Sequence, residues 1–312
     1  MAPTFNAKTT AEEVATAFAS EIKGKNVLIT GTSQNGIGFE SARVIAKHAN
    51  LVIITGYNAE RLQKSEDAIK KETPHANVRK LQVDLSSLAS VRKAAAEVNS
   101  WPEPLHVVIH NAAAGIFGFK PTVDGLEAQI ATAYVGPFLF TKLVAPKILA
   151  AGSSSYTPRV VFLSSSVHAM GPGVDFEQLE KPTAEKHSAF PAYFASKSAT
   201  VLGKINSYSV SPGAIFTNIN QKEESLADFK GAGMLKEDGT PNEAAFTWKT
   251  IPEGAATTTI AAFDPALDSV PGAYLDDSVV ANEKVAPHSS DPATAAKLWT
   301  VTEKIVGETF TF

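Results

Sequence analysis

The stretch "TGTSQNGIG", residues 30–38, joins the apolar run Val27–Ile29 to the amphipathic segment Phe39–His48. It contains three glycines, Gly31, Gly36 and Gly38. Their order, G-x4-G-x-G, differs from the G-x-G-x-x-G of the common dinucleotide fingerprint. A glycine-rich loop that leaves a strand and enters a helix can direct its backbone N–H groups at a pyrophosphate. On its own, this loop fits either a phosphate cradle or an ordinary strand-to-helix turn.

Short β-branched runs alternate with longer helical patterns along much of the chain. Strands are predicted at 27–30, 51–55, 78–83, 106–109, 160–163 and 205–210. Helices are predicted at about 36–48, 59–71, 87–99, 124–150 and 192–204. Strands that alternate with helices, several of them uniformly apolar, indicate a parallel sheet covered on both faces. We therefore expect an α/β fold with a doubly wound parallel sheet, a Rossmann fold, in a single domain over residues 1–312.

Composition excludes several classes of function. The chain has 312 residues, of which 44% are hydrophobic, and this is ample for a buried core. The net charge of -4 is small and the basic residues are scattered, which argues against nucleic acid or anionic membrane as a partner. There is no cysteine, and no His, Asp or Glu group has the spacing of a metal site, so no metal is expected. Residues 1–25 lack a continuous apolar segment, which argues against a signal peptide and favours a cytoplasmic location.

A second candidate cluster lies downstream, in "LSSSVH" (163–168) and "YFASK" (193–197). Tyr193 and Lys197 are four residues apart and would share one face of a helix. A tyrosine with an ordinary pKa of ~10 keeps its proton near neutral pH, but a lysine ammonium and a bound nicotinamide cation nearby would lower that pKa. Tyr193 is thus a candidate general acid/base, with a serine of Ser164–Ser166 holding the reacting oxygen. The alternative is a half-buried tyrosine beside a solvated lysine.

Further motifs follow one another in a characteristic order. They are the TG…GIG loop, "VDLSS" (83–87), "HNAA" (110–113), "GPFLFTKL" (136–143), "VVFLSSS" (160–166), Y-x-x-S-K (193–197), "SPGAIFT" (211–217) and "PEGAATTTIAAFDP" (252–265). From about Lys23 to Gly307 the chain resembles the short-chain dehydrogenase/reductase family, specifically its retinol-dehydrogenase-like and WW-domain-oxidoreductase-like fungal branch. The glycine loop of that family varies in length between TG and GIG, so the spacing seen here agrees with the resemblance.

The resemblance implies roles for individual residues. Ser165 matches the catalytic serine, Tyr193 the acid/base, and Lys197 the residue that lowers the tyrosine pKa and binds the nicotinamide ribose. The residues implied to bind the cofactor are Gly31, Ser33, Gly36, Ile37, Gly38, Asn58, Asp84, Leu85, Asn111, Ala112, Tyr193, Lys197, Pro212, Gly213, Ile215 and Thr217. The segment at about 218–250 would cover the substrate site.

The activity implied by the resemblance is NAD(P)-dependent oxidoreduction between an alcohol and an aldehyde or ketone, as a carbonyl reductase or alcohol dehydrogenase. The partner would be a small-molecule substrate. The alternative is a catalytically weak or inactive dinucleotide-binding sensor or interaction module on the same fold.

Two side chains depart from the family pattern near the implied site. In "ATAYVGPF" (131–138), Ala133 stands where relatives have an asparagine that helps hold a water in a proton relay, so the relay would rely on backbone or on Tyr134. In "ITGYNAERL", Tyr57 stands where many relatives have arginine, and the lack of an acid there argues against NAD specificity. Arg61 and Lys64 either reach a 2′-phosphate or form an exposed helix face. NADP is favoured over NAD.

The connection from "YFASK" to "SPG" is the third departure. Residues 194–204 would span ~16 Å as a helix, whereas a strand of five or six residues is roughly 17 to 20 Å long. We expect a fifth helix that ends near Gly203 with almost no loop, or else a segment missing from this sequence. Because the fourth and fifth helices form the usual dimer face in this family, a monomer or weak homodimer is expected.

The remaining aromatic candidates are ambiguous. His168 either touches substrate or forms part of the wall behind the serines. Trp101, Trp248 and Trp299 are expected to be packing residues, although Trp248 falls in the segment that covers the substrate site in relatives.

Overall fold

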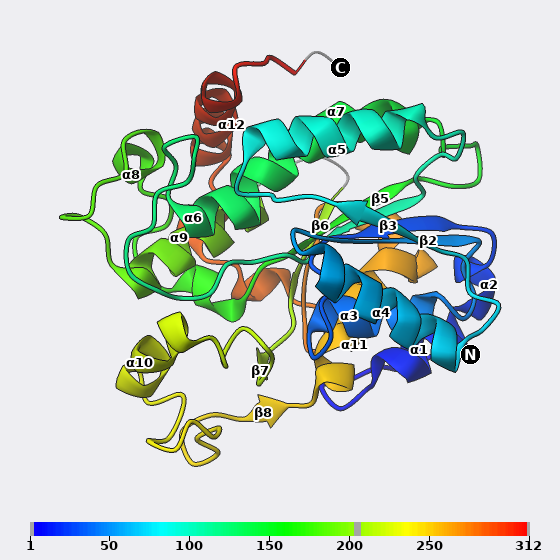
Figure 1. Cartoon of the computed structure of the whole chain (residues 1–312), viewed down its shortest axis with the longest axis horizontal. Coiled ribbons are helices and arrows are strands. Elements are labelled where there is room, and N and C mark those ends of the chain that lie inside the picture. Colours follow the sequence, from blue (N-terminus) through cyan, green and yellow to red (C-terminus); the bar gives the residue numbers. More distant parts are fainter. Residues whose placement is uncertain (1–2, 203–206, 311–312) are drawn as a thin grey trace.

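A computed structural model describes residues 3–202 and 207–310 of the protein. Its centre is an eight-stranded sheet in the order β10-β9-β6-β5-β4-β1-β2-β3 (Figure 1). The strands are β1 Asn26–Ile29, β2 Leu51–Gly56, β3 Val78–Gln82, β4 Val107–His110, β5 Arg159–Leu163, β6 Ser207–Ser211, β9 Tyr274–Asp276 and β10 Val279–Val280. All neighbours are parallel except β10, which pairs antiparallel with β9. The expected doubly wound Rossmann fold in one domain is confirmed.

Alternate residues of the buried strands face opposite helix layers. Val27 and Ile29 of β1 belong to one apolar cluster, and Leu28 belongs to the other. The first layer contains α1 Ala11–Ala17, α2 Ala19–Ile22, α3 Ile37–Ile45, α4 Ala59–Glu72 and α11 Ile251–Phe263. The second contains α5 Leu88–Ser100, α6 Ala128–Ile130, the π-helix Ala131–Val135, α7 Gly136–Leu149, α8 Phe176–Glu180, α9 Ala189–Leu202 and α12 Pro292–Val306.

The order of the strands places the ligand-binding edge. The chain runs from β1 outward to β3 and then returns to β4 on the other side of β1. In open α/β sheets, ligands bind at such a switch point, beyond the carboxyl ends of the strands. At this edge an additional segment carries α10 Glu223–Gly231 and a small sheet of β7 Ala214–Ile215 and β8 Trp248–Lys249 (yellow in Figure 1).

Most of the predicted elements are present with small shifts in their ends. The π-helix interrupts the helix expected over 124–150, and α9 begins at Ala189, three residues before its predicted start at 192. The described part of α9 ends at Leu202 and β6 begins at Ser207. The predicted end of this helix near Gly203 and the first residues of the predicted strand lie outside the described residues. Within the described parts of the chain, every helix is too short or too polar to cross a membrane.

Candidate functional site

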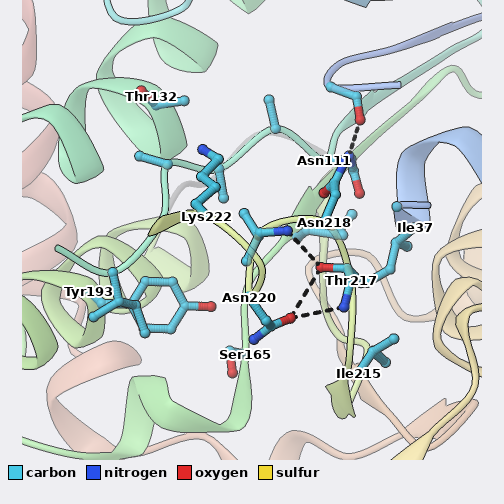
Figure 2. A pocket seen from close by; sticks show the side chains of 18 of the residues that line it. Ile37, Asn111, Thr132, Ser165, Tyr193, Ile215, Thr217, Asn218, Asn220 and Lys222 are labelled. Carbon is cyan, nitrogen blue, oxygen red and sulfur yellow. Dashed lines mark hydrogen bonds between the residues drawn. The ribbon is translucent and has the colours of Figure 1, made fainter. Parts of the chain in front are cut away.

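A pocket of about 1070 Å³ opens at the carboxyl edge of the sheet. Its walls come from the glycine loop, the segments that follow β2, β4, β5 and β6, and the first half of α9. Figure 2 shows that Ile37, Asn111 and Thr217 lie on one side of the pocket and Tyr193 on the other. Segments far apart in sequence therefore supply one cavity, as expected for this edge of a doubly wound sheet.

The glycine loop is packed too closely for side chains. Gly31 has a φ of +72°, and a Cβ there would lie 2.8 Å from Cα of Ala112. A Cβ on Gly38 would lie 2.5 Å from the Gly31 carbonyl oxygen and would collide with the Asn111 amide. Asn111 Nδ2 donates to the carbonyl oxygens of Thr30 and Gly31, both at 2.9 Å, and so ties this loop to the end of β4. The absence of side chains at Gly31 and Gly38 therefore lets the loop pack against the end of β4, and its backbone at Gly31 and Gly36 lines the pocket.

Ser165, Tyr193 and Lys197 line the same pocket. Ser165 follows β5, whereas Tyr193 and Lys197 lie one turn apart on α9. The Tyr193 hydroxyl points into the pocket (Figure 2). Lys197 Nζ lies 5.4 Å from the centre of the Tyr193 ring and donates to the Leu163 carbonyl oxygen at 2.9 Å. Folding has thus brought together the three residues that the sequence singled out.

Burial controls the protonation of this cluster. It raises the pKa of Tyr193 to about 12, although a hydrogen bond with the Ser165 side chain acts in the opposite direction. It also lowers the pKa of Lys197 to about 8. Each burial effect disfavours the charged form of the side chain. At neutral pH the tyrosine therefore carries its proton, while the lysine is largely charged and close to its titration range.

The local structure distinguishes the three adjacent serines. Ser164 is buried, and its hydroxyl donates to the Lys197 carbonyl oxygen at 2.9 Å. Ser166 is exposed and begins a 3-10 helix. Ser165 remains as the serine whose hydroxyl is coupled to Tyr193. The preference for Ser165 over its two neighbours, which rested on resemblance alone, thus has a physical argument in the contacts of the three hydroxyls.

The turn that contains Ala133 contributes a different polar group to the pocket. Ala133 is buried, and the Tyr134 hydroxyl lies 3.4 Å from Thr302 Oγ1, inside the second helix layer. Tyr134 therefore does not lie in the pocket wall, where it was proposed to replace the asparagine. Thr132, which sequence reasoning missed, lines the pocket. The position of Thr132 in the wall depends on the π-helix at 131–135. A helical pattern in the sequence does not reveal a π-helix.

Most of the implied cofactor residues line the pocket, and two do not. Those in the wall are Gly31, Ser33, Gly36, Ile37, Asp84, Leu85, Asn111, Ala112, Tyr193, Lys197, Pro212, Gly213, Ile215 and Thr217. Gly38 lies behind the wall, against Gly31 and Asn111. Asn58 caps α4, since its side-chain oxygen accepts from the Arg61 N–H at 2.9 Å. Both residues shape the site from outside it.

The segment after β6 crosses over the glycine loop. We call residues 217–222 the strap. The Asn218 N–H donates to the Asn35 carbonyl oxygen, and Asn218 Nδ2 donates to the Gln34 carbonyl oxygen, both at 3.0 Å. Within the strap, Asn220 Oδ1 accepts from the Thr217 N–H at 2.9 Å (Figure 2). These bonds place the strap against the glycine loop.

Beyond Tyr193 the pocket wall is apolar and largely aromatic. Its members are Ile116, Phe117, Met170, Phe190, Phe194, Ile219, Phe229, Met234, Phe246 and Trp248. Trp248 thus lies in the wall, whereas Trp101 stacks with Arg79 and Trp299 packs on Phe138. His168 is buried, and its Nδ1 donates to the Ser165 carbonyl oxygen at 2.8 Å, so it supports the serine from behind.

Comparison with known proteins agrees with this geometry. The short chain dehydrogenase family matches residues 25–226. The chain belongs to the short-chain dehydrogenase/reductase family. Short-chain dehydrogenase TIC 32 B, chloroplastic, from Brassica napus is 33% identical over 318 residues, covering 97% of this chain and 94% of that protein. Retinol dehydrogenase 13 from Mus musculus is 30% identical, covering 92% and 85%.

The fold comparison extends to more distant proteins. A crystal structure of an uncharacterised protein from Mycobacterium paratuberculosis superimposes with a TM-score of 0.67 at 22% identity, covering 94% of this chain and 98% of that one. This likeness establishes the fold of the short-chain dehydrogenase/reductase, independently of any activity.

Proposed function

We propose that this short-chain dehydrogenase/reductase interconverts an alcohol and an aldehyde or ketone, using a nicotinamide dinucleotide. The observation that carries the proposal is that Ser165, Tyr193 and Lys197 share one pocket with the backbone of the glycine loop at Gly31 and Gly36. One end of the pocket therefore offers proton chemistry, and the other offers backbone for a pyrophosphate.

The residues of the pocket fit such a cofactor. Gly31 and Gly36 leave backbone accessible, and α3 begins at Ile37, so its N-terminus faces the position of a pyrophosphate. Asp84 and Leu85 would hold the adenine, and Ile215 and Thr217 the nicotinamide side. When bound, the cofactor supplies or accepts the hydride. We favour NADP because Tyr57 follows β2 where an acid would be needed to accept hydrogen bonds from the ribose hydroxyls of NAD.

The protein's own residues move and hold the proton in this proposal. In the reducing direction, Tyr193 donates its hydroxyl proton to the carbonyl oxygen of the substrate, and Ser165 donates a hydrogen bond to the same oxygen. The charged Lys197 stabilises the phenolate that remains on Tyr193. Because Tyr193 is protonated at neutral pH, the site is prepared to act as an acid. This state favours carbonyl reduction as the first chemistry to test.

The aromatic wall indicates the kind of substrate. Phe117, Phe190 and Trp248 surround the space beyond Tyr193, so the carbonyl compound would have an apolar body of considerable size. We propose that the segment at about 218–250 covers this space, since α10 and β8 stand over the carboxyl edge of the sheet (Figure 1).

Replacing Tyr193 with phenylalanine tests the mechanism. Tyr193→Phe keeps the ring and removes the transferable proton, so turnover with NADPH and a reactive aldehyde should fall ~10²- to 10⁴-fold. The affinity for the cofactor, measured by calorimetry, should be nearly unchanged. Tyr134→Phe is the matched control, because that hydroxyl lies inside the second helix layer, and it should keep full turnover. Wild-type turnover in Tyr193→Phe would refute the mechanism.

A second candidate function rests on Ala133. Without the family's asparagine, the chain could be a dinucleotide-binding module with little or no catalysis. Purified protein, NADPH and a panel of aldehydes and ketones distinguish the two functions. Thermal stabilisation by NADPH together with its oxidation supports the enzyme. Stabilisation without oxidation of NADPH supports the binding module.

A further inference from the structure

Lys222, at the end of the strap, is a cation on the wall of the pocket. Its side chain lines the pocket, and Figure 2 shows it extending from the strap into that space. Among the hydrogen bonds and ion pairs of residues 3–202 and 207–310, none involves its ammonium group. The side chain is half-buried, so this charge is only partly compensated by water. A bound anion would satisfy it.

Arg61 shares a small open extension of the pocket with Lys222. The extension is lined by Tyr57, Arg61, Lys222, Glu223 and Glu224. Its walls come from the segment after β2 on one side and from the strap and the start of α10 on the other. The guanidinium of Arg61 makes a long contact with the Tyr57 hydroxyl, at 3.4 Å, and interacts electrostatically with Glu60. Two cations from opposite walls therefore face one space.

The charges around this extension favour an anion. Burial lowers the pKa of Lys222, and the positive charges of Arg61 and Lys120 lower it further, against the effect of Glu224. Glu224 also pairs with Lys120, at 3.9 Å. Glu223 is the remaining carboxylate on this rim. Around this extension the cations Lys222, Arg61 and Lys120 thus face the two carboxylates Glu223 and Glu224, which leaves a small excess of positive charge that an anionic ligand can meet.

We propose that Lys222 and Arg61 bind the 2′-phosphate of NADP(H) from opposite walls and so set the cofactor preference. The proposal rests on the proposed function, since it assumes a dinucleotide in the groove. The adenosine ribose of a dinucleotide lies at the end of β2 in this fold, which is where Tyr57 and Arg61 lie. Tyr57 cannot pair with a phosphate as an arginine would, and Lys222 supplies the missing positive charge from the strap.

The position of Lys222 couples cofactor choice to closure of the groove. It lies five residues after Thr217 and four after Asn218, which binds the glycine loop. A phosphate held by Lys222 would therefore hold the strap against the groove at a second point. NAD, which lacks this phosphate, would leave the strap held by Asn218 alone.

Titration calorimetry with paired ligands tests the proposal. Wild-type protein should bind NADP⁺ more tightly than NAD⁺, and 2′,5′-ADP more tightly than 5′-AMP. Lys222→Met should weaken binding of NADP⁺ and 2′,5′-ADP by about tenfold or more, because a charge-assisted hydrogen bond to phosphate is lost. Binding of NAD⁺ and 5′-AMP should be unchanged. Arg61→Met should behave in the same way.

Two further variants sharpen the result. Lys120→Met removes a neighbouring exposed charge that already pairs with Glu224, and it should leave the preference for NADP⁺ intact. Glu223→Gln removes the competing carboxylate and should strengthen NADP⁺ binding. Equal weakening of NADP⁺ and NAD⁺ in Lys222→Met, or no weakening, would overturn the proposal. Equal binding of both cofactors by the wild type would also overturn it, whereas failure to bind either dinucleotide would refute the proposed function itself.

Discussion

Lys197 has an environment that leaves it close to losing its charge. It is buried, its ammonium has one carbonyl partner, and its pKa is lowered to about 8. Tyr193 is shifted in the other direction, to a pKa of about 12. Both shifts arise from desolvation, which favours the neutral form of each group. Across the neutral range Tyr193 therefore stays protonated, and Lys197 is the group that titrates.

The pH dependence of reduction should follow Lys197. Below a pH of about 8 the lysine is charged and can stabilise the tyrosine phenolate; above it, this stabilisation is lost. Initial-rate kcat/KM for NADPH, which reports the free enzyme, should decrease as the pH rises through this value. Lys197→Arg keeps its charge at high pH, so any activity it retains should lack that decrease. A wild-type profile that stays level well above the pKa of Lys197 would contradict this assignment.

The candidate catalytic residues could be recognised in the sequence, but the contacts that surround them could not. Tyr193 and Lys197 were recognisable because their spacing places both on one helix face. Ser165 could not be separated physically from Ser164 until the bond between Ser164 and the Lys197 carbonyl was seen. Lys222 gave no local signal, because its importance depends on Arg61, which is distant in sequence and meets it only after folding.

The glycine loop leaves little room for added side-chain atoms. Gly38 belongs to the first turn of α3, and a Cβ there would collide with the Gly31 carbonyl and the Asn111 amide. Both of these groups are backbone or are held by hydrogen bonds, so neither can move freely. The residue lies outside the pocket wall, yet it sets how closely α3 approaches β4.

Gly38→Ala should destabilise the protein and weaken cofactor binding together. Inserting a methyl group into a well-packed contact costs ~1–3 kcal/mol, and the displaced loop would no longer present its N–H groups correctly. Thermal melts and calorimetry with NADP⁺ measure both effects. Gly118→Ala is the control, since a Cβ there meets nothing within 4 Å. Unchanged melting and binding in Gly38→Ala would show that the loop can adjust.

Elements with a strong sequence pattern were predictable. Short strands that form only by pairing with a distant segment were not. Each of the buried strands β1, β2, β4 and β5 contains a continuous apolar run of three or four residues. In contrast, β9 has only three residues, Tyr274–Asp276, and is a strand because β6 lies beside it. The small β7–β8 sheet pairs residues that are more than thirty positions apart. Such pairing leaves no pattern within either segment.

At the scale of the whole molecule, the C-terminal region covers part of α7 and α9, the two helices that the family resemblance implies as a dimer face. α12 packs against α9, and Trp299 and Phe310 contact the Phe138 ring of α7 at 5.1 and 4.6 Å between ring centres (Figure 1). Lys142 of α7 pairs with Glu308 at 2.8 Å. The described part of α9 is also only 14 residues long. Apolar surface on α7 that a partner subunit would use is therefore occupied from within the chain.

The protein should consequently be a monomer, or at most a weak dimer. A stable dimer interface buries about 800 Å² on each partner, and here α12 and the residues after it would have to be displaced first. Sedimentation velocity over a wide concentration range should give a single monomeric species. Trp299→Ala and Lys304→Ala probe the covering layer: the first loosens the contact with Phe138 and should promote self-association, whereas the second removes an exposed ion pair with Glu180 and should change little. A concentration-independent dimer of the wild type would show that this face, or another, associates despite its cover.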